Sequence, residues 1–219
     1  MQDTLLDAIV VGLRALRSTE LLGLRRQFPV LPVVVYAAFR PDDGELLFRL
    51  DEAGDTTAVA VEGVDDAVVG NVVWSRSLAR SRRQLLDDAP KLLRLSEAIQ
   101  LKAWEALVID GADRLATGTL ASRLGVSREH LSRQFGAGGA PNLKRVLDLV
   151  RIVTAAQLLA NPGYDRRDAA RLLAFATPSH LSATSRRIAG VPASKLQVLG
   201  PRGVFEAFVR ESGRGRSRN

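Results

Sequence analysis

The tripeptide His-Leu-Ser occurs twice in this chain, at residues 130–132 and 180–182, fifty residues apart. Each copy lies inside the same larger pattern, which spans residues 120–135 and 169–182. The pattern has a small residue, a short apolar helix, a tight turn and then a polar helix, which is the arrangement of a helix-turn-helix unit. Two such units constrain this part of the chain to an α-helical domain.

The residue types of the first copy have mechanical reasons. Ala121 is small where two helices cross, and Gly125 suits a left-handed turn between them because it has no Cβ. Ser127 is predicted as the N-cap of the next helix. Leu131 and Phe135 are four residues apart, so they share one face and are predicted to pack inward.

The opposite face of that second helix is predicted to be exposed and polar. Side chains of this kind reach base edges in the major groove of DNA. The candidate DNA-binding residues of the first copy are Ser127, Arg128, Glu129, Ser132 and Arg133. For one copy alone, an ordinary helical hairpin with a solvated face is an equally good interpretation.

The segment between the two copies predicts one long helix. Apolar residues recur at helical spacing over residues 143–159, and about 17 helical residues span roughly 25 Å. Such a spacer is suited to hold two helices about one turn of DNA apart, roughly 34 Å. The candidate DNA-binding residues of the second copy are Ser179, Ser182, Arg186 and Arg187.

Charge is distributed unevenly along the chain. Residues 1–96 carry 12 basic and 14 acidic side chains, a net charge of −2, whereas residues 97–219 carry 19 and 10, a net charge of +9. The basic part contains both copies of the repeat, and positive charge supplies most non-specific affinity for DNA. Double-stranded DNA is therefore the favoured partner, although an Arg-rich solubilising surface would explain the charge alone.

The first part of the chain alternates strand and helix patterns. Apolar, β-branched runs predict short strands at residues 8–11, 32–36 and 57–61. Helices are predicted at residues 18–27, 45–52 and 65–86. This alternation predicts a small α/β domain with a parallel sheet.

A domain boundary is predicted at residues 87–90, Asp-Asp-Ala-Pro, because apolar residues follow helical spacing beyond it. The fold class is therefore mixed, with a small α/β domain at residues 1–88 and an all-α domain at residues 97–199. The tail at residues 211–219 is basic and poor in apolar residues, so it is predicted to be disordered.

Residues 97–199 resemble the DNA-binding domain of the AraC/XylS family of bacterial transcription regulators. The resemblance rests on the end of the first unit, an Arg-led spacer helix with paired leucines, the start of the second unit and a Gly-x-x-Pro-like ending, at residues 131–135, 151–159, 168–175 and 186–194. As in the family, the second unit has one extra residue before its Leu. The resemblance implies a sequence-specific regulator that contacts two successive major grooves, with RNA polymerase as a candidate protein partner.

Three residues of the second unit depart from the family pattern. Ala174 stands where the turn usually has Gly, Ser185 where an aromatic core residue is usual, and Ala183 where a basic residue is common. A polar residue in a core costs stability unless it is paired, so the second unit is expected to discriminate bases less well. The alternative is a protein-interaction adaptor, or a non-specific DNA binder, whose second unit has decayed.

Residues 7–86 resemble the last part of a response-regulator receiver domain. In that resemblance Gly12 stands in place of the phosphoacceptor Asp, Glu62 in place of a Lys, and the first two strands with their metal-binding acidic pair are missing. Phosphoryl transfer then has no chemistry to use. The implied domain is degenerate and receiver-like, and a truncated sheet exposes an edge that invites homodimerisation; an unrelated small α/β domain is the alternative.

Several classes of protein are disfavoured. The chain has no Cys, no apolar run long enough to span a membrane and no signal peptide, so a cytoplasmic protein is expected. The two His residues occupy equivalent positions of the repeat, and no phosphate-binding or nucleophile motif appears. We therefore expect no enzyme activity, no catalytic or metal-binding residues and no cofactor.

Overall fold

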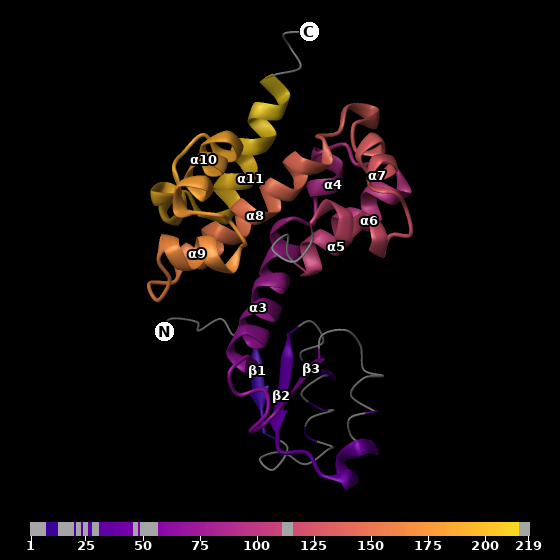
Figure 1. Ribbon diagram of the computed structural model, residues 1–219, viewed down its shortest axis with the longest axis vertical. Coiled ribbons are helices and arrows are strands. Elements are labelled where there is room, and N and C mark those ends of the chain that lie inside the picture. The colour runs from indigo at the N-terminus through magenta and orange to yellow at the C-terminus, as the bar shows by residue number, and fades with distance from the viewer. Residues whose placement is uncertain are drawn as a thin grey trace. The chain divides into compact units, whose positions relative to one another are not determined.

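The computed structural model describes residues 8–12, 20, 23, 26–27, 31–45, 48, 57–110 and 116–214. The chain divides between Ser81 and Arg82 into two compact units, the α/β unit and the helical unit (Figure 1). The first unit contains a small sheet, and the second is helical, so the predicted mixed fold class is confirmed.

The sheet of the first unit has three parallel strands in the order β1 (Ile9–Val11), β2 (Val33–Ala37) and β3 (Thr57–Val61). The three predicted strands and their parallel arrangement are therefore confirmed. β2 lies in the centre and is apolar on both faces, because a central strand of a parallel sheet has no solvent side. Helix α3 (Val69–Leu85) packs on the face that carries Val34, Ala58 and Ala60.

Other predictions for this unit fall where less is described. The predicted helices at 18–27 and 45–52 lie largely outside the described residues. A short 3-10 helix, η1 (Pro41–Asp43), forms in the turn that precedes the second of them. The receiver-like interpretation of this unit stays a prediction.

The predicted boundary at 87–90 lies inside the second unit. Helix α3 continues past the division, and α4 (Ala89–Leu92) follows it. Leu86, Ala89 and Leu93 are buried, and Arg82 donates hydrogen bonds to residues of the helical unit. Asp and Pro signal a turn, and in the structure this turn belongs to a packed unit.

The second unit is built around one central helix. α8 (Leu143–Ala160) has 13 buried residues among its 18, the number expected of a helix that is covered on most sides. Around it lie α5 (Ala98–Asp110), α6 (Thr117–Arg123), α7 (Arg128–Gln134), η2 (Ala137–Gly139), α9 (Arg166–Leu172), α10 (Pro178–Ala189), η3 (Ala193–Lys195) and α11 (Leu196–Arg214).

Helix α11 extends the second unit beyond residue 199, where the predicted domain ends. It packs along α8 through Val204, Phe205 and Phe208. The predicted disordered tail begins at residue 211, but residues 211–214 form the last turn of this helix. Glu211 forms an ion pair with Arg145 of α8, with 3.4 Å between Oε2 and Nη2, which helps to hold that turn. Residues 215–219 lie outside the described part of the chain.

Candidate nucleic-acid interface

The first helix-turn-helix unit consists of α6 and α7, and its turn is closed by two backbone hydrogen bonds. The Gly125 amide donates to the Ser122 carbonyl, and the Val126 amide donates to the Ala121 carbonyl, both at 3.1 Å. Gly125 has φ +68°, as a helix that ends in this double bond requires. The predicted left-handed turn at Gly125 is confirmed.

Helix α7 begins with the side-chain cap that the sequence predicts. The Ser127 hydroxyl accepts a hydrogen bond from the His130 amide at 3.1 Å. Leu131 and Phe135 are fully buried, so they fix which side of the helix faces the core. Arg128, Glu129, Ser132 and Arg133 are exposed together with Ser127, which places all five predicted residues of this unit on the solvent side.

The second unit consists of α9 and α10 and closes its turn in the same way. The Ala174 amide donates to the Arg171 carbonyl at 3.2 Å, and the Phe175 amide donates to the Ala170 carbonyl at 2.8 Å. Ala174 has φ +52°, so an alanine adopts the left-handed conformation that glycine adopts in the first unit. One extra residue, Ala176, lengthens this turn before the next cap.

An arginine from the central helix holds this unusual turn in place. Arg151 of α8 donates from Nε and Nη2 to the Leu173 carbonyl, at 3.2 and 2.5 Å. Its guanidinium also lies 3.9 Å from the ring centroid of Phe175, a cation–π contact. A non-glycine residue persists at positive φ only where its surroundings over-determine it, and these contacts supply that constraint.

Helix α10 carries the predicted residues of the second unit, but two of them have partners inside the protein. The Thr177 hydroxyl caps the helix by accepting from the His180 amide at 3.0 Å, and Ser179 is exposed beside it. Ser182 is half-buried, and its hydroxyl accepts from the Ala193 amide at 3.3 Å.

The two predicted phosphate-contacting arginines of α10 also differ. Arg186 is exposed. Arg187 forms an ion pair with Asp148 of α8, with 2.6 Å between Nη2 and Oδ2. The side chain of Asp148 is only 7% exposed, and a buried carboxylate needs such a partner. Arg187 therefore stabilises the domain in addition to any contact it makes with DNA.

The polar residue at core position 185 is paired, so the stability cost expected of an unpaired one does not apply. Ser185 is fully buried, as its core position predicts, but its hydroxyl donates to the Val191 carbonyl at 2.7 Å. A paired buried hydroxyl carries little penalty. The serine instead fastens helix α10 to the segment that follows it.

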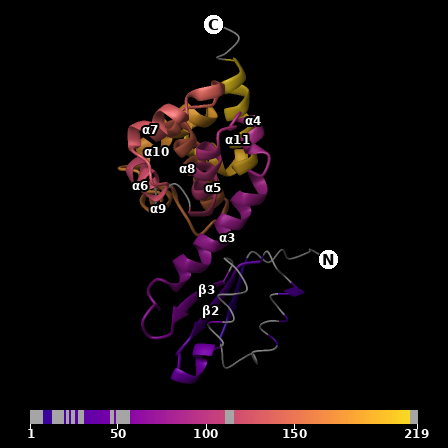
Figure 2. The same ribbon diagram turned by 90° about the vertical axis from the view of Figure 1, so that its right-hand side faces the viewer.

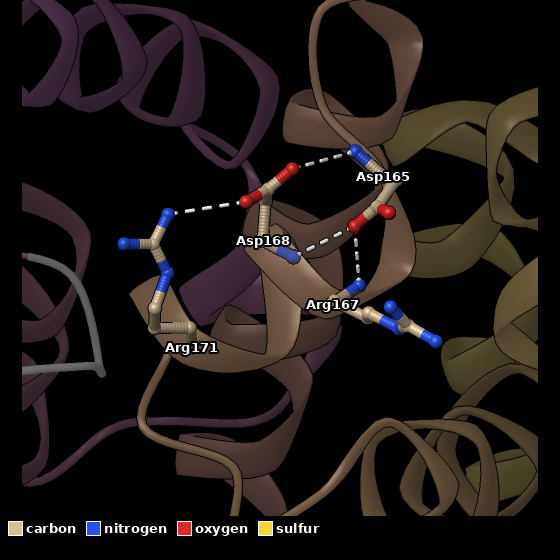
Figure 3. A network of polar contacts seen from close by, with 4 residues as sticks. All are labelled: Asp165, Arg167, Asp168 and Arg171. Carbon is tan, nitrogen blue, oxygen red and sulfur yellow. Dashed lines mark hydrogen bonds and ion pairs between the residues drawn. The ribbon is translucent and has the colours of Figure 1, made fainter.

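The start of α9 contains a polar network that the sequence reasoning missed (Figure 3). The Asp165 carboxylate accepts from the amides of Asp168 at 2.9 Å and Arg167 at 2.7 Å, and these bonds lower the pKa of Asp165. The Asp168 carboxylate accepts from the Asp165 amide at 3.2 Å and pairs with Arg171 at 3.1 Å. This reciprocal arrangement is a capping box.

Arg167 and Arg171 are further candidate phosphate contacts. Both are exposed, and both line a hollow beside Thr177 and Pro178 at the start of α10. The signal in the sequence is the run Arg166-Arg167-Asp168, with Arg171 one helical turn later. Asp168 follows the two arginines directly, so the local net charge is lower and the run does not stand out as a basic patch.

The two units lie at different ends of the central helix. Figure 1 shows α6 and α7 on one side of α8 and α9 and α10 on the other. Figure 2, turned by 90°, shows all four helices together on one side of the domain, with α4 and α11 on the other. With 18 residues, α8 is about 27 Å long.

The sheet of the α/β unit has a polar cluster at the carboxyl ends of β2 and β3. The Tyr36 hydroxyl donates to Asp66 Oδ1 at 2.6 Å, which raises the pKa of Tyr36 to about 12. The same bond, with a second from the Gly63 amide, lowers the pKa of Asp66. Glu62 Oε2 accepts from the Ala38 amide at 3.2 Å, so Glu62, which follows β3, is bonded to the residue that follows β2.

In the part of the chain that the structure describes, no helix is both long enough and apolar enough to cross a membrane. Within the same ranges, no cluster of three or more His, Cys, Asp or Glu side chains is placed to hold a metal ion.

Comparison with known proteins supports the helix-turn-helix assignment. Residues 120–197, about a third of the chain, match the model of a family described as a helix-turn-helix domain. The match includes α7, α8, α9 and α10, so it spans both units. Comparisons with curated proteins and with solved structures give no match. The prediction of a helix-turn-helix domain is confirmed, whereas the receiver-like resemblance of the α/β unit has no support from these comparisons.

Proposed function

We propose that this protein is a sequence-specific, DNA-binding transcription regulator whose two helix-turn-helix units contact successive major grooves. The observation that carries the proposal is the pair of side-chain-capped helices, α7 and α10, attached to one buried helix and facing the same side of the domain. Their exposed residues are polar or basic, as an element that enters a major groove requires. The matched family model supports the same function.

Within this proposal, the two units contribute differently. In α7 the exposed set Arg128, Glu129, Ser132 and Arg133 offers side chains that discriminate bases, with Arg133 suited to a bidentate contact to guanine. In α10, Ser182 is bonded to Ala193, and Arg187 is paired with Asp148. We therefore assign base discrimination mainly to the first unit and phosphate contacts mainly to the second.

A binding titration tests the DNA-binding function. The affinity of the full chain for duplexes selected from a randomised pool is compared with its affinity for random duplexes at two salt concentrations. Binding is measured by fluorescence anisotropy, with the label on the protein or on the DNA. A regulator of this kind should prefer the selected duplexes and lose affinity steeply as salt rises. Equal affinity for all duplexes would contradict sequence specificity, and a shallow salt dependence would favour the protein-interaction adaptor.

Two arginine variants test the role of the first unit. Arg133→Ala should lower affinity for selected duplexes by about 1–3 kcal/mol with a smaller loss on random DNA. Arg210→Ala is the matched control, since it removes an equal charge from an exposed position of α11. If both variants lose affinity equally on both kinds of DNA, Arg133 contacts phosphate and not a base.

The selected sequences themselves test the division between the units. One half-site should emerge with high information content, and its neighbour, about 10 base pairs away, with little. Two equally sharp half-sites would mean that Ser179 and its neighbours discriminate bases.

The α/β unit at the start of the chain has a proposed role in assembly. We assign it to protein contacts, with homodimerisation through its sheet as the favoured form and RNA polymerase as a further candidate partner of the whole chain. The supporting observation is that β1 and β3 are the outer strands of the described sheet, and outer strands present unpaired backbone groups. Sedimentation of the full chain tests this, and a monomer at all concentrations would contradict dimerisation. No enzymatic step is part of the proposed function.

A further inference from the structure

We infer that Gln100 is a positioning residue that holds helix α7 in the orientation needed for base discrimination. This inference rests on the proposed function, because it assigns to α7 the base contacts of the first unit. Gln100 lies at the start of α5, outside both helix-turn-helix units, and its side chain is fully buried.

One side of the Gln100 amide caps its own helix. Its Oε1 accepts hydrogen bonds from the Ser96 amide at 2.9 Å and from the Glu97 amide at 3.1 Å. The first amides of a helix have no partners within the helix. A Gln three residues into a helix commonly bonds back to them, which is one half of a capping box.

The other side of the same amide reaches α7. Gln100 Nε2 donates to the Gln134 carbonyl at 2.7 Å. Gln134 is the last residue of α7, where carbonyl groups also lack partners within the helix. One planar amide therefore satisfies the beginning of one helix and the end of another.

This bond fixes a degree of freedom that apolar packing leaves open. Leu131 and Phe135 hold α7 against the core, but apolar contacts are not directional. A hydrogen bond to the terminal carbonyl prefers a narrow range of angles, so it restrains how far α7 turns about its own axis. Arg128, Glu129, Ser132 and Arg133 lie on the opposite face, and a small rotation would move all of them relative to the bases.

The loop after α7 makes this restraint more important. Gly138 and Gly139 of η2 both have positive φ, and residues of this kind add no rigidity through side chains. The next helix, α8, begins only at Leu143. The bond from Gln100 therefore ties the end of α7 directly to α5 across this loop.

Two substitutions separate the two halves of the Gln100 amide. Gln100→Met keeps the size of the side chain and removes both sets of hydrogen bonds. Gln100→Glu keeps the oxygen that accepts from Ser96 and Glu97, but it offers the Gln134 carbonyl a charged acceptor in place of a donor. Val204→Ala is the matched control, because it weakens the same domain at a buried position of α11, away from α7.

The measured quantity is the ratio of affinities for selected and random duplexes. We expect both Gln100 variants to lower this ratio about tenfold, with less than a threefold change on random DNA. Partial unfolding lowers both affinities alike, so Val204→Ala should leave the ratio unchanged. Hydrogen exchange of the amides at residues 128–135 should be faster in the Gln100 variants than in Val204→Ala.

The outcomes separate the two levels of the proposal. Wild-type protein that prefers no duplex would overturn the proposed function. An unchanged affinity ratio in folded Gln100→Met, or unchanged exchange at residues 128–135, would overturn the role of Gln100 and leave the DNA-binding function standing.

Discussion

The strongest prediction about stability concerns Arg82, which the sequence would assign to the α/β domain. Its side chain is buried in the helical unit, with 2% of the residue exposed. Nε donates to the Val108 carbonyl at 3.1 Å and Nη2 to the Ile109 carbonyl at 3.3 Å, at the end of α5. Nη1 donates to the Thr154 hydroxyl of α8 at 3.3 Å. We expect Arg82→Met to destabilise the helical unit strongly.

The magnitude is worked from the burial of the guanidinium and from hydrogen bonds that include these three. Hydrogen bonds to a charged group contribute about 1.5–3 kcal/mol each, but burial of a guanidinium costs several kcal/mol in lost hydration. Met retains most of the aliphatic stem, so little apolar packing is lost. A net loss of about 2–4 kcal/mol is the result, which corresponds to roughly 6–15 °C in Tm for a unit of this size.

Fluorescence of Trp104 provides the assay. Trp104 is buried in α5, one helical turn before the carbonyl that accepts from Arg82 Nε. With Trp74 replaced by Phe in all proteins, Trp104 is the single tryptophan and reports unfolding of its own unit in urea. Arg83→Met is the control, because Arg83 is the next residue and is exposed. Equal urea midpoints for the two variants would refute the reasoning.

Three further predictions concern turns and titrating groups. Gly125→Ala should destabilise the first helix-turn-helix unit by about 1 kcal/mol, because a left-handed conformation is unfavourable for a residue with a Cβ. Ala174→Gly should be neutral or stabilising by up to about 1 kcal/mol. Thermal melts in which both variants change Tm in the same direction would contradict this. Absorbance titration should show that Tyr36 ionises at about pH 12 and that Asp66→Asn lowers this value, since the Asp66 carboxylate holds the phenol proton. The pKa of Asp165 is lowered in the folded protein, so its contribution to stability is complete above the unfolded-state pKa and is lost as pH falls through the folded-state pKa. Asp165→Asn should therefore flatten the acid side of the curve of unfolding free energy against pH. An unchanged curve would show that this carboxyl does not contribute to the loss of stability in acid.

Features with a local signal could be predicted from the sequence. The three strands follow from runs of β-branched residues, and the cap at Ser127 and the turn at Gly125 follow from what each residue does to its own backbone. The exposed face of α7 follows in turn, because Leu131 and Phe135 define the buried one. Most of the candidate site in the first unit was therefore available from helical periodicity.

Features that depend on distant partners could not be predicted. Nothing near Arg82 indicates that its guanidinium meets Thr154, 72 positions away. Nothing near Ser185 indicates that a buried hydroxyl finds the Val191 carbonyl, so the sequence suggested a defect where the structure has a bond. The last turn of α11 is polar, so the sequence predicted disorder from residue 211, whereas in the structure Glu211 of that turn forms an ion pair with Arg145 of α8.

The departures in the second unit therefore have a different meaning from decay. Ala174 adopts the left-handed conformation under the constraint of Arg151, and Ser185 and Arg187 have specific partners inside the domain. In the second helix-turn-helix unit, Ser182, Ser185 and Arg187 instead bond to other parts of the helical unit and stabilise it. Under the proposed function, we expect such a unit to hold the domain on the DNA backbone, while Arg128, Glu129, Ser132 and Arg133 of the first helix-turn-helix unit distinguish the bases.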